Sequence, residues 1–312
     1  MNPPCIIGCG AMGGLLALQL YKATATPPIC ITRRGEQAGY LQANGLTVSL
    51  PQGRVFHVPV RAYPAEEVAG TLCRRAVVSV KAYDLPKALD VAKETGVDDA
   101  WVLVNGLVGE DLMRDLGFKP RFIVSTYGAT RVSDTEVEVR GSGVHLIGSP
   151  EGLDGESCRL SLTLSRGGAD AYCVGNITPW RIEKAAVNAA INGITSILDS
   201  ENGIITSNPY ARSLAERVGS EAERIIQALK LGNVARSIVE EILRVAEETA
   251  GNVSSMLQDL RSCRGTEADS IYKPLIELAR QSGLKAGTIE TLYITVKAIE
   301  WGGHRCRRSA RR

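Results

Sequence analysis

The sequence is poor in aromatic residues and in net charge, and both shortages narrow its possible folds and partners. Only 5% of the 312 residues are Phe, Trp or Tyr, so any core must be mainly aliphatic. The formal net charge is +2, which argues against a dedicated nucleic-acid binder, because such proteins carry a strongly basic surface. With 44% hydrophobic and 22% charged residues, the composition is that of a soluble globular protein of one large or two ordinary domains.

Long apolar runs, a secretory leader and metal-ligand spacings are also missing. No apolar run approaches the roughly 18 residues that would suggest a membrane span, and the chain starts without the charged and apolar regions of a signal peptide. We therefore expect a cytoplasmic protein with no membrane partner. The eight cysteines form no CxxC pair and no zinc spacing. We predict that they are reduced, mostly buried thiols, that Cys5 and Cys9 are small packing residues rather than a redox pair, and that there is no metal site.

The first half of the chain alternates short β-rich runs with helical patterns. Compact apolar runs predict strands at residues 5–7, 29–32, 76–80, 101–104 and 122–126. Two more runs, 137–139 and 144–147, flank Gly141 and Gly143 and suggest a hairpin-like ending. Strands alternating with helices are typical of an α/β fold, so we predict a Rossmann-type doubly wound parallel sheet.

The second half loses its β-rich runs near residues 174–179. Helical patterns cover residues 180–198, 209–231, 234–249 and 286–300, with Pro209 suited to a first turn and Gly232 to a C-terminal stop. We therefore expect a nucleotide-binding domain at residues 1–177 and an all-α domain at 178–312. The arginine-rich tail from Gly302 is expected to be frayed and solvated rather than a nucleic-acid contact.

The stretch IIGCGAMGG follows the first predicted strand and supplies Gly8, Gly10 and Gly13 in the pattern G-x-G-x-x-G. The first glycine permits a tight turn, the second lets the backbone approach a pyrophosphate, and the third lets the helix pack closely on the sheet. An ordinary glycine loop is the alternative. Its place between a strand and a helix favours dinucleotide binding.

The end of the second predicted strand favours NADP. NAD-binding domains carry an Asp or Glu here for the ribose hydroxyls, whereas this chain has Arg33 and Arg34 and no carboxylate until Glu36. Guanidinium groups bind a 2′-phosphate bidentately. A basic surface turn is the alternative. Lys81 and Asn105 follow two further strands, at the sheet edge where such folds bind ligands.

The stretch KAAVNAAINGI places Lys184, Asn188 and Asn192 at intervals of four residues in an otherwise apolar helix. Each step of four advances the helix by about 400°, so the three groups form one slanting stripe. Burying an amide without partners costs about 1–3 kcal/mol. The stripe either bonds to neighbouring carbonyls or lines a site, where a lysine with its pKa lowered by burial can serve as a general acid.

A further polar segment, NVSSMLQDLRSCRGTEAD, lies downstream. Asn252 and Ser255 suit helix caps and Glu267 suits a first turn, so structural roles compete evenly with functional ones for these residues.

Together these motifs resemble the ketopantoate reductase family over nearly the whole chain. The matching segments are GCGAMGG, VKAYD, VNGLVG, KAAVNAAIN, ENG and SSMLQDLRSCRGTEAD. The resemblance implies reduction of 2-dehydropantoate by NADPH, on the path to pantothenate and coenzyme A, with Lys184 as the catalytic acid. It implies that substrate is bound by Asn105, Asn188, Asn192, Asn202 and Ser255. It implies that the cofactor is bound by Gly8, Cys9, Gly10, Ala11, Met12, Gly13, Arg33, Arg34, Lys81, Asn105, Thr130 and Glu267.

The chain departs from the family pattern in two places. Ile182 stands two residues before the lysine, where the family usually has an aromatic residue, and IYKP replaces the usual ING after TEAD. Pro274 in that segment is expected to break or restart its helix.

The alternatives are a related NADPH-dependent reductase of another 2-oxo acid, an opine-type reductase, and a non-catalytic NADP sensor. The expected partner is a small 2-oxo acid, with a homodimer possible. The site is expected between the two domains.

Overall fold

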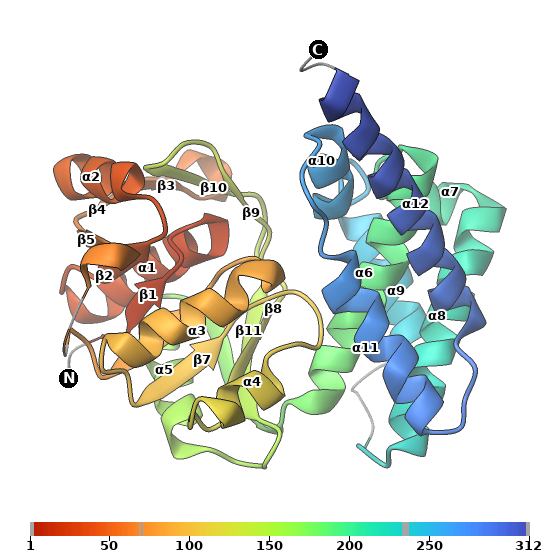
Figure 1. Ribbon diagram of the computed structural model, residues 1–312, viewed down its shortest axis with the longest axis horizontal. Helices are drawn as coiled ribbons and strands as arrows, with labels where there is room; N and C mark the ends of the chain where they lie inside the picture. The colour runs from red at the N-terminus through yellow and green to blue at the C-terminus, as the bar shows by residue number, and fades with distance from the viewer. Residues whose placement is uncertain (1–2, 69, 71, 233–236, 310–312) are drawn as a thin grey trace. The chain divides into compact units, whose positions relative to one another are not determined.

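The computed structural model describes residues 3–68, 70, 72–232 and 237–309, with side chains up to residue 302. The chain divides into two compact units (Figure 1). The first comprises Met1–Val104 and Gly109–Ile177, and the second comprises Asn105–Val108 and Thr178–Arg312. The second unit thus takes a short segment from the middle of the first, an exchange that no sequence pattern indicated.

The first unit is built on a mainly parallel sheet. Among its described residues the sheet has eight strands in the order β12-β11-β8-β7-β6-β1-β2-β5. The strands are β1 (Cys5–Ile7), β2 (Ile29–Thr32), β5 (Arg61–Pro64), β6 (Arg75–Val78), β7 (Asp99–Val102), β8 (Phe122–Ser125), β11 (Val144–Ser149) and β12 (Asp170–Asn176). Strands β1, β2 and β5 to β8 run parallel, β11 runs antiparallel to β8, and the edge strand β12 runs parallel to β11. The predicted Rossmann-type α/β fold is confirmed.

A second, smaller sheet covers the first helix. Its described strands are β3 (Leu46–Ser49), β4 (Val55–Val58), β9 (Ala129–Arg131) and β10 (Glu136–Val139), in the order β4-β3-β10-β9. The predicted hairpin of β10 and β11 is therefore wrong, because the two strands lie in different sheets. Sequence periodicity detects a strand but does not choose its neighbour.

The helices of the first unit pack around these sheets. They are α1 (Ala11–Thr24), α2 (Gly35–Asn44), α3 (Leu85–Glu94), α4 (Glu110–Asp115) and α5 (Gly155–Arg166), with 3₁₀ turns at η1 (Pro51–Gly53), η2 (Ala65–Glu67) and η3 (Ala82–Asp84). Helix α1 contacts β1 on one side and β3, β4, β9 and β10 on the other. Every residue from Gly13 to Leu20 is consequently buried, which explains why this helix is apolar all round.

The prediction that all the cysteines are reduced thiols is wrong. Two disulfides cross-link the first unit, and they are Cys5–Cys73 and Cys158–Cys173. The first forms because Cys5 is in register with Ala76 of β6, just after Cys73, although 68 residues separate the two sulfurs in the chain. Cys9 and Cys30 are buried free thiols whose Sγ atoms lie 3.3 Å apart. The side chain of Cys306 lies outside the described residues.

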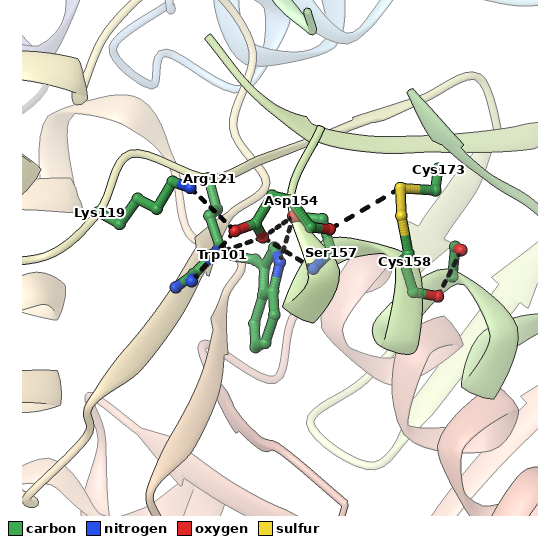
Figure 2. The surroundings of a disulfide bond; sticks show 8 residues. Trp101, Lys119, Arg121, Asp154, Ser157, Cys158 and Cys173 are labelled. Carbon is green, nitrogen blue, oxygen red and sulfur yellow. Dashed lines mark hydrogen bonds and ion pairs between the residues drawn. A yellow bond between two sulfur atoms is a disulfide. The ribbon is translucent and has the colours of Figure 1, made fainter. Parts of the chain in front are cut away.

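The Cys158–Cys173 disulfide lies beside a buried polar cluster at the start of α5 (Figure 2). Asp154 caps the helix by accepting a hydrogen bond from the Ser157 N–H at 2.9 Å, and it also accepts one from Arg121 Nε at 2.7 Å. Burial raises the pKa of Asp154, but the hydrogen bonds from Arg121 and Ser157 outweigh it and hold the pKa well below its ordinary value. The disulfide and this cluster together fix α5 against the sheet.

The second unit is helical throughout its described elements. They are α6 (Thr178–Leu198), α7 (Ile204–Ser207), α8 (Pro209–Ala228), α9 (Ile238–Glu248), α10 (Ser255–Arg261), α11 (Ala268–Gln281) and α12 (Gly287–Ser309). Helix α6 contacts each of the other six. The predicted helix at 180–198 is therefore the centre of this unit, as its nearly continuous apolar sequence requires.

Several predicted helix boundaries need correction. Pro209 begins α8 as expected, but α8 ends at Ala228, before Gly232. Residues 233–236 of the predicted helix at 234–249 lie outside the described residues. The expected break at Pro274 is wrong, because α11 continues through it. The expected frayed tail is helical as far as Ser309, and Arg311 and Arg312 lie outside the described residues.

None of the described helices combines the length and the apolar character that crossing a membrane would require.

The Cys158–Cys173 disulfide should contribute measurably to stability. It closes a loop of 15 residues, for which chain entropy gives about 3 kcal/mol. Changing both cysteines to serine should lower the free energy of unfolding in urea by about that amount. Cys263→Ser, which alters a free thiol, should leave it nearly unchanged. Alkylation of Cys158 and Cys173 in unfolded, unreduced protein would contradict the disulfide.

Candidate functional site

The glycine loop lies where the strand order of the parallel sheet reverses. The loop follows β1, whose neighbours β2 and β6 carry the chain away in opposite directions. Gly8 has φ +93°, and a Cβ there would stand 2.3 Å from the Ser79 carbonyl oxygen. A Cβ on Gly13 would stand 2.1 Å from the Gly8 oxygen, whereas Gly10 has open space. Two glycines are thus required by packing, and the third leaves room for a ligand.

The start of α1 offers backbone donors. Gly10 occupies the N-cap position without a side-chain cap, and the first intrahelical bond runs from the Gly14 N–H to the Gly10 carbonyl at 2.8 Å. The N–H groups of Ala11, Met12 and Gly13 therefore have no acceptor within the helix. This uncapped terminus, beside the open space at Gly10, fits the pyrophosphate of a dinucleotide.

Gln37 supports the glycine loop, a role that the sequence did not indicate. Its Nε2 donates to the carbonyl of Cys9 at 2.9 Å and so ties the glycine loop to α2. The side chain is buried, and its place in a surface-like stretch, GEQAGY, gave no signal of this role.

Arg33 and Arg34 follow β2 as the sequence indicated. Arg33 is exposed and its Nη1 lies 3.2 Å from Asp84 Oδ1, while Arg34 donates to Asp134. Both guanidinium groups lie at the surface and within reach of solvent anions. Surface ion pairs of this kind contribute about 0–1 kcal/mol, so a bound phosphate can replace them at small cost.

The structure places two other predicted cofactor residues in the first unit. Lys81 stands directly before η3, at the carboxyl end of β6. Thr130 lies on β9, opposite Glu138 in the sheet that packs against α1.

The polar stripe of α6 lies in the second unit and is headed by Lys184. Lys184 and Asn188 are half-buried and Asn192 is buried, with Ala185 and Ala189 fully buried between them. Among the residues that the structure describes, the Lys184 ammonium has no hydrogen-bond or ion-pair partner within bonding distance. The alternative that Lys184 has a solely structural role, bonded to neighbouring carbonyls, therefore has no support.

The pKa of Lys184 reflects opposing influences. Burial lowers the pKa, and the negative charges of Glu241 and Glu183 partly oppose this. Glu241 is held by Arg244, whose Nε lies 2.9 Å from its Oε2. Burial, followed by repulsion from Glu241, raises the pKa of Glu183 to about 7. The Lys184 ammonium, a hydrogen-bond donor, thus lies near the carboxylates of Glu241 and Glu183, which act on it through their charge and not through a direct bond.

A chain of amides joins the stripe to Glu267. The Asn188 Nδ2 donates to the Asn105 Oδ1 at 3.4 Å, and the Asn105 Nδ2 donates to Glu267 Oε2 at 2.8 Å. Glu267 is buried at the N-cap of α11, one residue before the first turn that the sequence suggested, and its side chain makes no capping bond. Its carboxylate faces Asn105 instead. Residues that are 83 and 162 positions apart in the chain are brought together here.

Asn202 lies in a loop of the same unit, and Ser255 begins helix α10. The Asn202 Nδ2 donates to Thr249 Oγ1 at 2.9 Å, while its buried Oδ1 has no partner among the residues that the structure describes. Ser255 is exposed at the first position of α10, and Ser254 accepts the capping bond from the Leu257 N–H. The suggested caps at Asn252 and Ser255 are therefore wrong, and the Ser255 hydroxyl is exposed and available to a ligand.

Two family models match this chain. The model described as ketopantoate reductase PanE/ApbA covers residues 5–152, and the model of its C-terminal part covers residues 176–300. A 2-dehydropantoate 2-reductase of Pyrobaculum aerophilum is 32% identical over 296 residues, which are 95% of this chain and 97% of that protein. The Bacillus subtilis protein of the same name is 32% identical over 302 residues, which are 95% of this chain and 96% of that protein.

Solved structures agree with these matches. The structure of a probable 2-dehydropantoate 2-reductase of Bacillus subtilis has a TM-score of 0.74 at 28% identity, covering 94% of this chain and 98% of that one. A D-mandelate dehydrogenase with NADH and anilino(oxo)acetate has a TM-score of 0.84 at 22% identity over 97% of this chain and 100% of that one, a likeness of fold alone. The resemblance seen in the sequence is confirmed, and the chain belongs to the ketopantoate reductase family of oxidoreductases.

Proposed function

We propose that this protein reduces 2-dehydropantoate to pantoate with NADPH and that Lys184 is the general acid. The observation that carries the proposal is the ammonium of Lys184 on a buried helix, which has no partner within bonding distance in the part of the chain that the structure describes. Removing a cation from water without a partner is costly, so a group of this kind is stabilised when an anionic ligand binds. A 2-oxo acid brings a carboxylate and a carbonyl oxygen, which match an ammonium flanked by amides.

The chemistry requires a proton donor and a stabiliser of negative charge. Hydride addition to the 2-oxo carbon gives an alkoxide, which must receive a proton. Lys184 can supply both the positive charge and the proton, and burial lowers its pKa toward the range in which an amine is an effective acid. Glu241 and Glu183 limit that lowering, so that the amine keeps its proton until the alkoxide forms.

The amides complete the substrate site. Asn188 and Asn192 extend the stripe beyond Lys184 and would hold the substrate carboxylate and hydroxyl without adding charge. Asn105, held by Glu267, would contact both the substrate and the nicotinamide. The buried Oδ1 of Asn202 and the exposed hydroxyl of Ser255 would meet the far end of the substrate.

The first unit carries the residues that fit NADPH. When bound, NADPH supplies the hydride. The glycine loop, including Cys9 to Met12, would hold its pyrophosphate, and Arg33 or Arg34 would hold its 2′-phosphate. Lys81 and Thr130 complete the proposed cofactor residues of this unit, and Glu267 of the second unit is proposed to contact the cofactor as well.

Reduction of a different 2-oxo acid is the second candidate. The same fold occurs in a protein named D-mandelate dehydrogenase, whose structure contains anilino(oxo)acetate. A substrate panel with 2-dehydropantoate, other 2-oxo acids and an added amine separates the pantoate, hydroxy-acid and opine-type reactions. Any NADPH turnover excludes a non-catalytic sensor.

We also propose a cytoplasmic homodimer. The cytoplasm suits a consumer of NADPH, and a dimeric ketopantoate reductase of Staphylococcus aureus has the same fold at 20% identity. Disulfides persist in intracellular proteins of hyperthermophiles, so Cys5–Cys73 and Cys158–Cys173 are compatible with this compartment.

Lys184→Ala should lower kcat by about 10²- to 10⁴-fold, the usual contribution of a general acid. NADPH binding, measured by fluorescence titration, should be retained. Lys273→Ala, which removes an exposed lysine of the same unit, should leave kcat near that of the unaltered enzyme. Retention of full turnover in Lys184→Ala would reject the general-acid role.

Changing Arg33 and Arg34 together to alanine should weaken NADPH binding by more than about tenfold while changing NADH binding little, because charged hydrogen bonds to the 2′-phosphate contribute about 1.5–3 kcal/mol. Arg74→Ala, which removes another exposed guanidinium, serves as the control. Equal losses for both cofactors would show that the pair does not recognise the phosphate.

Glu241→Gln should lower the pKa of Lys184, because it removes a negative charge that favours the ammonium. The basic limb of the kcat/KM profile should then move to lower pH, with fuller ionisation of Glu183 offsetting part of the change. Glu248→Gln removes the other carboxylate bonded to Arg244 and should not move that limb. A limb that stays in place in Glu241→Gln, or moves equally in both variants, would contradict this assignment.

A further inference from the structure

Helix α11 contains a proline in its interior. Pro274 is the seventh residue of Ala268–Gln281, and the helix does not end there. Proline has no N–H, so the carbonyl of Ser270, four residues earlier, lacks the donor that a regular helix would provide. The proline ring also presses on that carbonyl and tilts it away from the helix axis.

The Ser270 carbonyl has another donor instead. It accepts a hydrogen bond from the Leu107 N–H at 3.1 Å. Gly106 lies directly against it, with φ +93°, and a Cβ at that position would stand 2.1 Å from the Ser270 oxygen. The segment Asn105–Val108 therefore docks on the backbone carbonyl that the proline leaves open.

The docked segment is held at its other end by α6. The carbonyl of Val108 accepts a hydrogen bond from Arg181 Nη2 at 2.8 Å, and the Leu107 side chain packs against the helical core of the second unit. The segment thus has fixed attachments on both α11 and α6.

The attachment of Leu107 to the Ser270 carbonyl, here called the dock, determines where Asn105 lies. Asn105 is two residues before Leu107, and Glu267 is three residues before Ser270, within one helical turn. The 2.8 Å bond between Asn105 and Glu267 and the 3.4 Å bond from Asn188 both depend on that separation. A shift of the segment along α11 would break the amide chain that leads to the stripe.

We propose that Pro274 is a positioning residue: it keeps the Ser270 carbonyl available to Leu107 and so fixes the Asn105 amide between Glu267 and Asn188. The effect on turnover rests on the proposed function, in which Asn105 contacts substrate. The hydrogen bond from Leu107 to the Ser270 carbonyl does not depend on that function.

Pro274→Ala supplies a backbone N–H that competes with Leu107 for the Ser270 carbonyl. Hydrogen exchange of the Leu107 amide, resolved by NMR, should then become faster. The melting temperature should stay the same or rise, because alanine suits a helix interior better than proline. The value of kcat/KM for 2-dehydropantoate should fall by about 3- to 10-fold, the equivalent of one hydrogen bond. Pro209→Ala, at the first turn of α8, should alter neither Leu107 exchange nor kcat/KM.

A double-mutant cycle separates positioning from general destabilisation. In an Asn105→Ala background, Pro274→Ala should cause no further loss of kcat/KM, because the side chain that it positions is already absent. Full additivity of the two losses would overturn the positioning role.

Unchanged Leu107 exchange in Pro274→Ala would also overturn the proposal, whatever the activity. Failure of the unaltered protein to oxidise NADPH with 2-dehydropantoate would instead count against the proposed function, and the exchange measurement would still decide whether Pro274 controls the dock.

Discussion

The second unit is organised around a positive charge that has no protein partner within bonding distance among the described residues. Helix α6 is buried on nearly every side because the other helices pack around it, yet Lys184 interrupts that apolar surface. Nearby carboxylates reduce the cost of burying such a charge. Glu241 and Glu183 do so here, since both favour the protonated form of Lys184.

The neutral amides around this charge serve a different purpose. Asn188 and Asn105 form a chain of amides that ends at the Glu267 side chain and orients donors without neutralising the ammonium. The dock of Leu107 on Ser270 then fixes this chain to the backbone rather than to flexible side chains. The departure from the family pattern at Pro274 thus becomes understandable as part of the support for Asn105. The other change in that segment, Tyr272, is buried and donates to the Ala189 carbonyl at 2.7 Å, over the space that Gly193 leaves open.

The sequence predicted those features that depend on local pattern. The glycine loop, the strand at Ile29–Thr32, the parallel α/β sheet and the Lys184 stripe follow from spacing and hydrophobic periodicity, and the structure has them. Features that depend on which distant segments meet could not be predicted. The second sheet, the Cys5–Cys73 disulfide and the Gln37 bond to Cys9 all require knowledge of strand order or of side-chain direction. The continuation of α11 through Pro274 was missed because the acceptor it frees is used by a segment far away in the chain.

Lys184 is proposed to bind an anionic 2-oxo acid through its ammonium group. Titration of its ¹³C-methylated amine by NMR, with and without the product pantoate in the presence of NADP⁺, tests this most directly, with Lys184→Arg used to assign the signal. A carboxylate bound beside the ammonium should raise the pKa of Lys184. A pKa and chemical shift that pantoate leaves unchanged, at concentrations that saturate the enzyme, would contradict the claim.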